Sequence, residues 1–227
     1  MYTLYIGNKN YSSWSLRPWL LMRELKLPFE ERLAVFEAEA TFEKFRAFSP
    51  TGRVPCLVDG ETTVWDSLSI VEYLAERHDG VWARDARARA WSRSASAEMH
   101  SGFSTLRNIC SMNCGIRVRL HEKPKALFAD IARLNELFGE GLKRHGGPFL
   151  AGRDFSAVDA FFAPVAFRQQ TYALNFEPTA GAYLQRLREL PNMRSWYADA
   201  LKEKWRDEPH DIESRAAGVW TEDLRAT

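Results

Sequence analysis

The sequence predicts a small α/β unit with the strand and helix order βαβαββα, followed by an all-helical bundle. Two observations carry this prediction. Up to His78, strand patterns with a period of two alternate with helical patterns. After Gly80, strand patterns almost disappear, and long runs with helical spacing replace them. The length of 227 residues permits such an arrangement of two modest domains.

The expected elements of the first unit follow one another closely along the chain. In order, they are a strand over Tyr2–Ile6, a helix over Leu16–Leu25, a strand over Phe29–Val35, a helix over Thr41–Phe48, a strand over Cys56–Val58 opened by Val54-Pro55, a strand over Thr62–Trp65 and a helix over Ser67–Arg77. Asp59-Gly60 predicts a hairpin turn between the last two strands. The helical crossover makes the first two strands parallel, and the hairpin makes the last two antiparallel. This order is that of a thioredoxin-like unit, which has a mixed sheet with helices on both faces.

The second unit is expected to contain only helices. The helical runs cover Asp85–Cys110, Pro124–Arg144, Ser156–Leu174, Leu184–Leu190 and Met193–Trp205. The stretch from Val158 to Phe167 is almost entirely apolar, which predicts a helix at the centre of the bundle. The polar tail after Pro209 is expected to lie over the surface. The boundary falls near His78 to Trp82, so we predict domains at 1–78 and 84–227.

Composition excludes several classes of function. The chain has 31 basic and 30 acidic residues, a net charge of +1, which gives no general attraction to nucleic acid or anionic lipid. No stretch approaches the apolar length of a membrane-spanning helix. Three cysteines are too few for a disulfide framework, and the N-terminus has no basic leader, so we expect a cytoplasmic protein without a targeting segment. The cysteines Cys56, Cys110 and Cys114 have no metal-ligand spacing, and no metal is expected.

Val54-Pro55 is the most informative point of the first unit. Proline cannot donate a hydrogen bond to a sheet, so a proline that opens a strand needs a special backbone. We hypothesise a cis bond, which would leave the amide and carbonyl of Val54 free to pair with a peptide-like ligand. The alternative is a tight turn that contacts no ligand.

Three serines between the first strand and the first helix form a second candidate site. Helix N-termini attract anions because their first amides are unpaired. Pro18 is best tolerated in a first turn, which favours Ser15 as the helix cap and leaves Ser12 and Ser13 facing a ligand. The alternative is that these serines only cap the helix.

Asp66-Ser67 stands where a strand passes into the last helix of the first unit. Ser67 offers a hydroxyl and an amide to a carboxylate, and Asp66 can pair with an ammonium group. Together they suit the zwitterionic end of an amino acid. The alternative is a purely structural helix start, because Ser69 and Glu72 form a capping-box pattern.

The order of these stretches resembles that of the soluble glutathione transferases over nearly the whole chain. Ser12–Arg17 is similar to the Ser-Ser-Cys-x-x-Arg stretch of the zeta class, with Trp14 in place of cysteine. Phe45–Pro50, followed by Val54-Pro55, is similar to the Phe-x-x-Leu-Asn-Pro and Val-Pro pattern of the family. Asp66-Ser67 stands where the family usually has Glu-Ser. Gly152–Asp159 resembles the folding motif of the family's second domain, with a capping box between Ser156 and Asp159.

The resemblance implies glutathione as cosubstrate and an electrophilic small molecule as second substrate. Ser12 aligns with the serine that donates a hydrogen bond to the glutathione sulfur, and Ser13 is the alternative. The resemblance places glutathione against Arg53, Val54, Pro55, Asp66 and Ser67. The electrophile is expected between the two domains, against Tyr11, Trp14, Phe103 and Arg107. Arg17 is expected to form an ion pair with the helical domain.

The family commonly dimerises, so a homodimer is also implied. The expected reaction is thiol transfer to the electrophile or glutathione-dependent isomerisation. The alternative is a non-catalytic binding or assembly module with the same fold. A thiol-disulfide oxidoreductase is disfavoured because the chain has no Cys-x-x-Cys and no cysteine between Tyr11 and Arg17.

Overall fold

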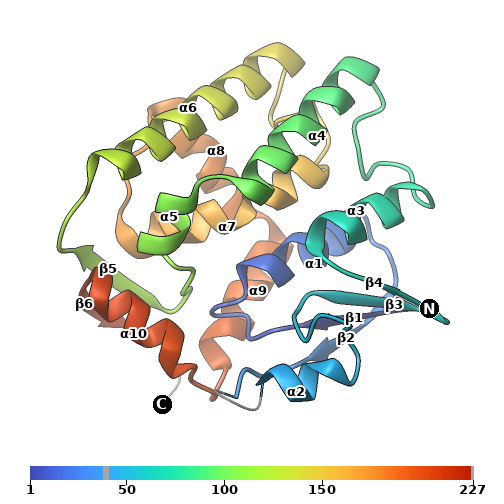
Figure 1. Cartoon of the computed structure of the whole chain (residues 1–227). Helices are drawn as coiled ribbons and strands as arrows, with labels where there is room; N and C mark the ends of the chain where they lie inside the picture. The colour runs from blue at the N-terminus through green and yellow to red at the C-terminus, as the bar shows by residue number, and fades with distance from the viewer. Residues whose placement is uncertain (38–40, 226–227) are drawn as a thin grey trace.

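The computed structural model describes residues 1–37 and 41–225, so the last two residues of the predicted 84–227 unit lie outside it. An α/β part forms one end of the molecule, and helices form the other (Figure 1). The α/β part contains β1 (Tyr2–Ile6), α1 (Ser13–Glu24), β2 (Phe29–Leu33), α2 (Thr41–Arg46), β3 (Cys56–Asp59), β4 (Thr62–Val64) and α3 (Ser67–Ala75). This order confirms the predicted βαβαββα arrangement.

The four strands form one mixed sheet in the order β2-β1-β3-β4. β1 runs parallel to β2 and antiparallel to β3, with Leu4 opposite Leu57. β3 and β4 form the predicted hairpin. The buried side chains of Leu4 and Ile6 anchor the sheet in the core. Helices α1 and α3 lie between the sheet and the helical part, and α2 lies on the far side of the sheet (Figure 1).

The helical part surrounds one buried helix. Its helices are α4 (Ala86–Ser101), α5 (Ser104–Ile109), α6 (Lys125–His145), α7 (Ala157–Tyr172), α8 (Pro178–Glu189), α9 (Pro191–Lys202) and α10 (Glu208–Ala217). α7 packs against α1, α4 and α8, which confirms the central helix predicted from the apolar stretch. The predicted capping box of Ser156 and Asp159 starts this helix. Among the described residues, no helix is long and apolar enough to cross a membrane.

The single helix predicted over Asp85–Cys110 is wrong, because the chain turns sharply between α4 and α5. Phe103 adopts a left-handed backbone with φ of 55°, which ends the helical path. A Cβ atom on Gly102 would lie 2.8 Å from the carbonyl oxygen of Glu98, so the turn requires glycine there. Arg107 on α5 then donates to the carbonyls of His100 and Gly102 across the turn. The break directs α5 toward the α/β part.

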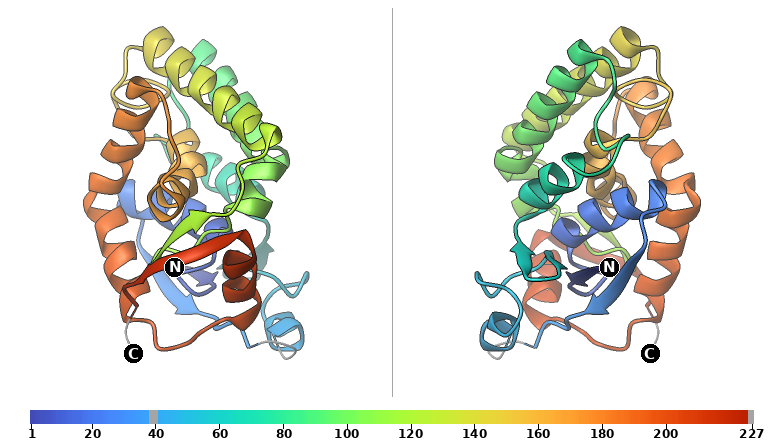
Figure 2. Two further views of the ribbon diagram at one scale, coloured as in Figure 1. Left: turned by 90° about the vertical axis from the view of Figure 1, so that its left-hand side faces the viewer. Right: turned by 90° about the vertical axis from the view of Figure 1, so that its right-hand side faces the viewer.

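The second part also contains a two-stranded antiparallel sheet that the all-helical prediction missed. It pairs β5 (Ile116–Leu120) with β6 (Gly218–Asp223). The tail after Pro209 is therefore not a surface tail, since α10 and β6 return to the body of the molecule (Figure 2). Cys110 caps the C-terminus of α5, and Cys114 lies in the loop beyond it.

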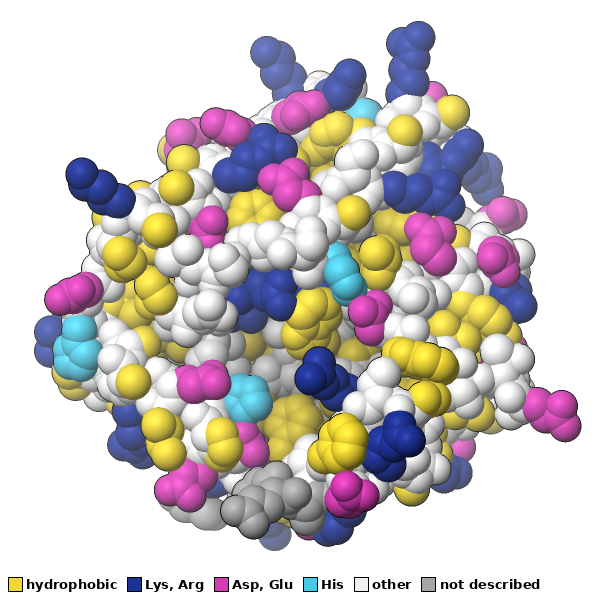
Figure 3. All heavy atoms as spheres, viewed as in Figure 1, with side chains coloured by type: hydrophobic (Ala, Val, Ile, Leu, Met, Phe, Trp, Pro, Cys, Tyr) yellow, Lys and Arg dark blue, Asp and Glu magenta, His cyan; other side chains and the backbone are white. Residues whose placement is uncertain are grey.

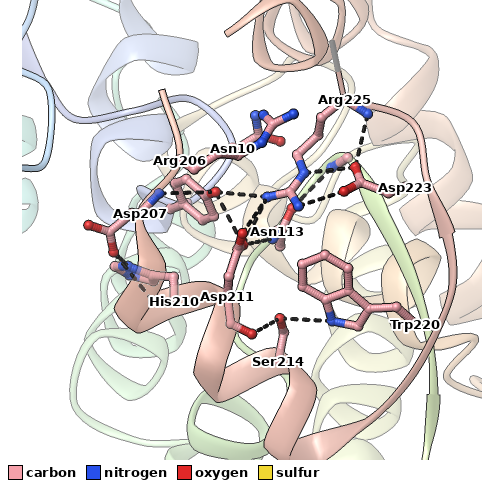
Figure 4. Close-up of polar contacts among 12 residues, drawn as sticks. Asn10, Asn113, Arg206, Asp207, His210, Asp211, Ser214, Trp220, Asp223 and Arg225 are labelled. Carbon is pink, nitrogen blue, oxygen red and sulfur yellow. Dashed lines mark hydrogen bonds and ion pairs between the residues drawn. The ribbon is translucent and has the colours of Figure 1, made fainter. Parts of the chain in front are cut away.

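A buried arginine fastens this C-terminal segment (Figure 4). The Arg225 side chain is 2 % exposed and pairs with Asp211 at 2.8 Å and with Asp223 at 2.7 Å. The same guanidinium donates to the hydroxyl of Tyr11 at 2.8 Å. Asp207, at the start of α10, contacts the imidazole of His210. The loop before α1 and the end of the chain are thus joined through one cluster of polar contacts.

We predict that Arg225→Ala lowers the free energy of unfolding by about 3 kcal/mol, because it removes a buried guanidinium and leaves the partly buried carboxylate of Asp211 without its counter-ion. Urea denaturation followed by circular dichroism measures this change. Arg32→Ala is the control, since the pair of Arg32 with Glu30 is exposed and should contribute little. Equal stability of Arg225→Ala and wild type would contradict the anchoring role.

Candidate functional site

Two adjoining cavities lie between the α/β part and the helical part. Their volumes are about 690 and 770 Å³. Trp14, Arg53, Val54 and Arg107 line both, so the cavities form one cleft. The first extends to Tyr11, Ser12, Ser13, Phe36, Thr41, Phe45, Gly52, Asn108, Ser111, Met112, Arg168, His210 and Glu213. The second extends to Phe42, Thr51, Pro55, Trp65 and Asp66. Figure 3 shows a hollow in which basic and apolar side chains gather.

The N-terminus of α1 lies at the first cavity, but its cap differs from the prediction. Ser12, rather than Ser15, is the N-cap, and its Oγ accepts from the amide of Ser15 at 3.4 Å. The Ser12 hydroxyl donates to Ser15 Oγ at 2.7 Å. Pro18 lies one turn further into the helix than the prediction assumed. The hydroxyl hydrogen of Ser12 therefore already forms a hydrogen bond within the protein.

Ser13 is the serine with a hydrogen to donate. It opens α1, is buried, and lines the first cavity. Its Oγ accepts from Nη2 of Arg168 at 3.4 Å. Within the described part of the chain, no group accepts its hydroxyl hydrogen. A ligand atom in the cavity can take that place.

The segment that leads into β3 also lines the cleft. The Val54–Pro55 bond is cis, as hypothesised. Val54 lines both cavities, and Pro55 lines the second. Arg53 is exposed at the shared edge of both cavities. The predicted ligand-facing turn and the serine loop thus line the same cavity.

Asp66 and Ser67 take different positions at the start of α3. Asp66 lines the second cavity and caps α3 by accepting from the amide of Leu68 at 2.9 Å. Its carboxylate also lies 3.3 Å from Nε2 of His100 on α4. Ser67 is fully buried, lines neither cavity, and its Oγ accepts from Nη1 of Arg17 at 3.4 Å. The Trp65–Asp66 peptide bond is cis.

The guanidinium groups of three arginines form a cluster at the cleft. Two of them, Arg17 and Arg107, contact the indole of Trp14, and the third, Arg168, contacts the Ser13 hydroxyl. Arg17 and Arg107 lie 4.1 and 4.6 Å from the centre of the Trp14 ring. Arg17 also lies 4.9 Å from the ring of Phe161. Among the described residues, no ion pair joins Arg17 to the helical part, so the predicted ion pair is wrong, and aromatic contacts replace it.

The electrostatics of this cluster are unusual because the cations are close together and two of them, Arg17 and Arg168, are buried. Burial, with the neighbouring charges of Arg107 and Arg168, lowers the pKa of Arg17 to about 9. Burial is also the largest cause that lowers the pKa of Arg168 to about 10. Burial lowers the pKa of Arg107 in the same direction. An anion in the cleft would relieve this repulsion.

The structure places three of the four residues expected to bind the electrophile at the first cavity and the fourth in the hydrophobic core. Tyr11, Trp14 and Arg107 line the first cavity. Phe103 lies in the hydrophobic core and lines neither cavity. Burial, the largest cause, raises the pKa of Tyr11 to about 12, and its hydroxyl contacts Arg225 and Asp211.

Sequence reasoning missed several residues that line the cleft. Arg168 is the most important, and a single charge at the end of the apolar stretch of α7 was a visible signal. His210 and Glu213 come from α10, in the segment expected to be a surface tail. The structure forms no cluster of three potential metal ligands in residues 1–37 and 41–225.

The fold and the cleft define a thioredoxin-like unit joined to a helical companion. Residues 11–77 match the family model described as "Glutathione S-transferase, N-terminal domain". A glutathione transferase homologue from Burkholderia, solved with bound glutathione, shares the fold with a TM-score of 0.65 and 22% identity, over 88% of this chain and 97% of that one. A diazinon-metabolizing glutathione S-transferase from Bombyx mori gives a TM-score of 0.69 at 15% identity, over 88% of this chain and 97% of that one.

Curated relatives extend the match along the sequence. A probable maleylacetoacetate isomerase from Caenorhabditis elegans is 25% identical over 184 residues, which are 77% of this chain and 82% of that protein. A dichloromethane dehalogenase from Methylorubrum extorquens is 46% identical over 61 residues, but this match spans only 26% of this chain and 21% of that protein. Residues 11–77 thus resemble the N-terminal domain of the glutathione S-transferases, and the whole chain shares their fold.

We predict that Asp66→Asn lowers the pKa of His100 further. Burial, the largest cause, already holds the pKa of His100 below its usual value, whereas the Asp66 carboxylate opposes that shift. NMR titration of the imidazole in both proteins measures the change.

The native His100 binds a proton less readily than the unfolded chain, so its contribution to stability is present above about pH 6.5 and is lost as the pH falls below that value. An unchanged midpoint in Asp66→Asn would show that the two side chains do not interact.

Proposed function

We propose that the protein activates the thiol of glutathione for attack on an electrophilic small molecule or for a glutathione-dependent isomerisation. The observation that carries this proposal is the position of the Ser13 hydroxyl at the N-terminus of α1, opposite Val54 across one cavity. The match of residues 11–77 to the glutathione S-transferase family model and the Burkholderia homologue with bound glutathione support it. In this proposal, residues 1–78 bind glutathione and residues 84–227 contribute the electrophile site.

Glutathione would lie along the edge of the α/β unit. The backbone of Val54 would pair with the cysteinyl part of the tripeptide. The carboxylate of Asp66 would hold the γ-glutamyl ammonium, and the amide of Ser67 in the first turn of α3 would hold the γ-glutamyl carboxylate. Arg53, with Pro55 beside it at the cleft, would pair with the glycyl carboxylate. These assignments use groups that line the cleft or begin the helix next to it.

The sulfur would then lie at the N-terminus of α1. A thiol attacks only as the thiolate, and its ordinary pKa is about 8.5. The Ser13 hydroxyl, the first amides of α1 and the nearby Arg168 all favour the anion. Ser12 remains the second candidate, although its hydrogen is directed to Ser15.

The cysteines disfavour redox chemistry in this cleft. Cys56, Cys110 and Cys114 are buried, and none lines either cavity. Burial raises the pKa of Cys56 to about 11 and the pKa of Cys110 to about 12. These thiols are poor nucleophiles at neutral pH.

We further propose a cytoplasmic homodimer that acts on small molecules, not on nucleic acid or membranes. Equilibrium sedimentation tests the dimer.

We predict that Ser13→Ala raises the pKa of bound glutathione by about 1–2, because a hydrogen bond to a charged group contributes about 1.5–3 kcal/mol. The ultraviolet absorbance of the thiolate, followed against pH, measures the shift. Turnover of a neutral aromatic halide at neutral pH should fall in parallel.

Ser12→Ala is the matched variant for this test. It removes the N-cap, so it should lower the free energy of unfolding by about 1 kcal/mol and leave the pKa of the thiol nearly unchanged. If Ser12→Ala shifts the pKa of the thiol and Ser13→Ala does not, the roles of the two serines are exchanged.

We predict that Asp66→Ala weakens glutathione binding by about tenfold, a modest effect because the carboxylate is half exposed and partly screened. Calorimetric titration with glutathione measures the dissociation constant. Asp79→Ala is the control, since Asp79 is exposed and lines neither cavity. Unaltered affinity in Asp66→Ala would remove Asp66 from the glutathione site.

A further inference from the structure

The arginine cluster of the cleft lacks the counter-ions that buried cations normally have. Arg17 and Arg168 are 1 % and 4 % exposed. Within residues 1–37 and 41–225, no ion pair involves Arg17, Arg107 or Arg168. Buried charges are ordinarily paired, so this cluster has unused capacity to bind an anion.

Two N–H donors of the cluster are unused. The Nε atoms of Arg17 and Arg168 are buried without a hydrogen-bond partner. The side chain of Arg107 donates hydrogen bonds to the carbonyls of His100 and Gly102, which are neutral. Those of Arg168 go to the carbonyls of Arg107 and Cys110 and to the hydroxyl of Ser13. None of these acceptors neutralises a positive charge.

The cluster adjoins the proposed glutathione site but extends into the helical part, because Arg107 lines both cavities and Arg168 lines only the first of them. Arg107 and Arg168 come from α5 and α7 of the helical part and line the first cavity. The groups proposed to hold the charged ends of glutathione begin α3 or lie beside Val54, in the α/β part. Glu213 lines the first cavity, but no ion pair between it and these arginines is formed in the described structure.

We propose that the electrophile carries a carboxylate, which Arg107 and Arg168 hold while its reacting carbon faces the sulfur beside Ser13. This inference rests on the proposed function. Guanidinium groups match the planar geometry of a carboxylate and can bind it through two parallel hydrogen bonds. The closeness of Arg168 to both Ser13 and the cavity places the bound acid within reach of the reacting centre. Trp14, whose ring contacts Arg17 and Arg107, lines the same cavity and can contact the apolar part of the electrophile.

Binding of unreactive probes tests the inference without turnover. Dinitrobenzoate and its methyl ester differ in the negative charge and the added methyl group, and neither carries a leaving halide. We expect the acid to bind the wild-type protein roughly 10–100-fold more tightly than the ester, as a charged hydrogen-bonded pair requires. Calorimetry measures both affinities, in the absence of glutathione and at saturating glutathione.

Variants of the two arginines identify the group that binds the acid. Arg107→Gln should reduce the affinity for the acid about tenfold, with little change for the ester or for glutathione. Arg168→Gln should also weaken acid binding and, because Arg168 contacts Ser13, should in addition raise the pKa of the bound glutathione thiol. If circular dichroism shows that Arg168→Gln does not fold, Arg168→Lys, which keeps the charge but loses the planar fork, should weaken acid binding to a smaller extent. Arg194→Gln is the control, because Arg194 is exposed and lines neither cavity.

The reactive analogue extends the test to catalysis. With chlorodinitrobenzoate, the glutathione thiolate forms a bond to the chlorine-bearing carbon, chloride leaves with the electrons of the broken bond, and the thiol proton passes to solvent. We expect kcat/KM for this acid to exceed that for its methyl ester, and Arg107→Gln to abolish the difference. The ester reports the thiol chemistry alone.

The outcomes separate the two proposals. Glutathione binding together with equal affinity for acid and ester overturns the inference alone. The inference also fails if glutathione displaces the acid, or if Arg194→Gln weakens acid binding as much as Arg107→Gln. Absence of glutathione binding overturns the proposed function, and with it the assignment of the acid as an electrophile.

Discussion

The stacking of two arginines on Trp14 is the contact on which the cleft depends. It joins α1, which carries Trp14 and Arg17, to Arg107 of α5 in the helical part. A desolvated cation–π contact contributes about 2 kcal/mol, whereas an unpaired buried charge costs about 3–5 kcal/mol. Stacking therefore offsets only part of the cost of burying these cations. The balance leaves a cleft that is held together by its aromatic ring and that still favours an anion.

The C-terminal segment completes the same cleft from another direction. Arg225 ties it to Tyr11, two residues before Ser13, and α10 places His210 and Glu213 along the first cavity. Phe36 stacks on His210 at 5.6 Å, so the loop after β2 contacts this segment as well. The position of the serine loop is thus set both by the sheet that precedes it and by the end of the chain.

Local patterns in the sequence predicted much of the fold and part of the site. Alternating polarity, the Asp59-Gly60 turn and the apolar stretch of α7 each act over a few residues, and the structure confirms the elements they indicate. The break at Phe103 was missed because a left-handed residue after Gly102 leaves little trace in a helical pattern. β5 has an alternating pattern in Ile116–Leu120, but its partner lies about a hundred residues further along the chain, and no local rule predicts that pairing.

The difference between Ser12 and Ser13 shows where local reasoning ends. Both are hydroxyls at the start of one helix, and cap preferences alone cannot decide which one keeps a hydrogen for a ligand. The decision comes from Ser15, which takes the hydrogen of Ser12, and from Arg168, which occupies the oxygen of Ser13 from more than 150 residues away. Because a guanidinium can only donate, it turns the Ser13 hydroxyl into a donor toward the cavity. The same cation draws negative charge to that point, so the electrostatics that favour a thiolate and those that favour an acidic second substrate have one source.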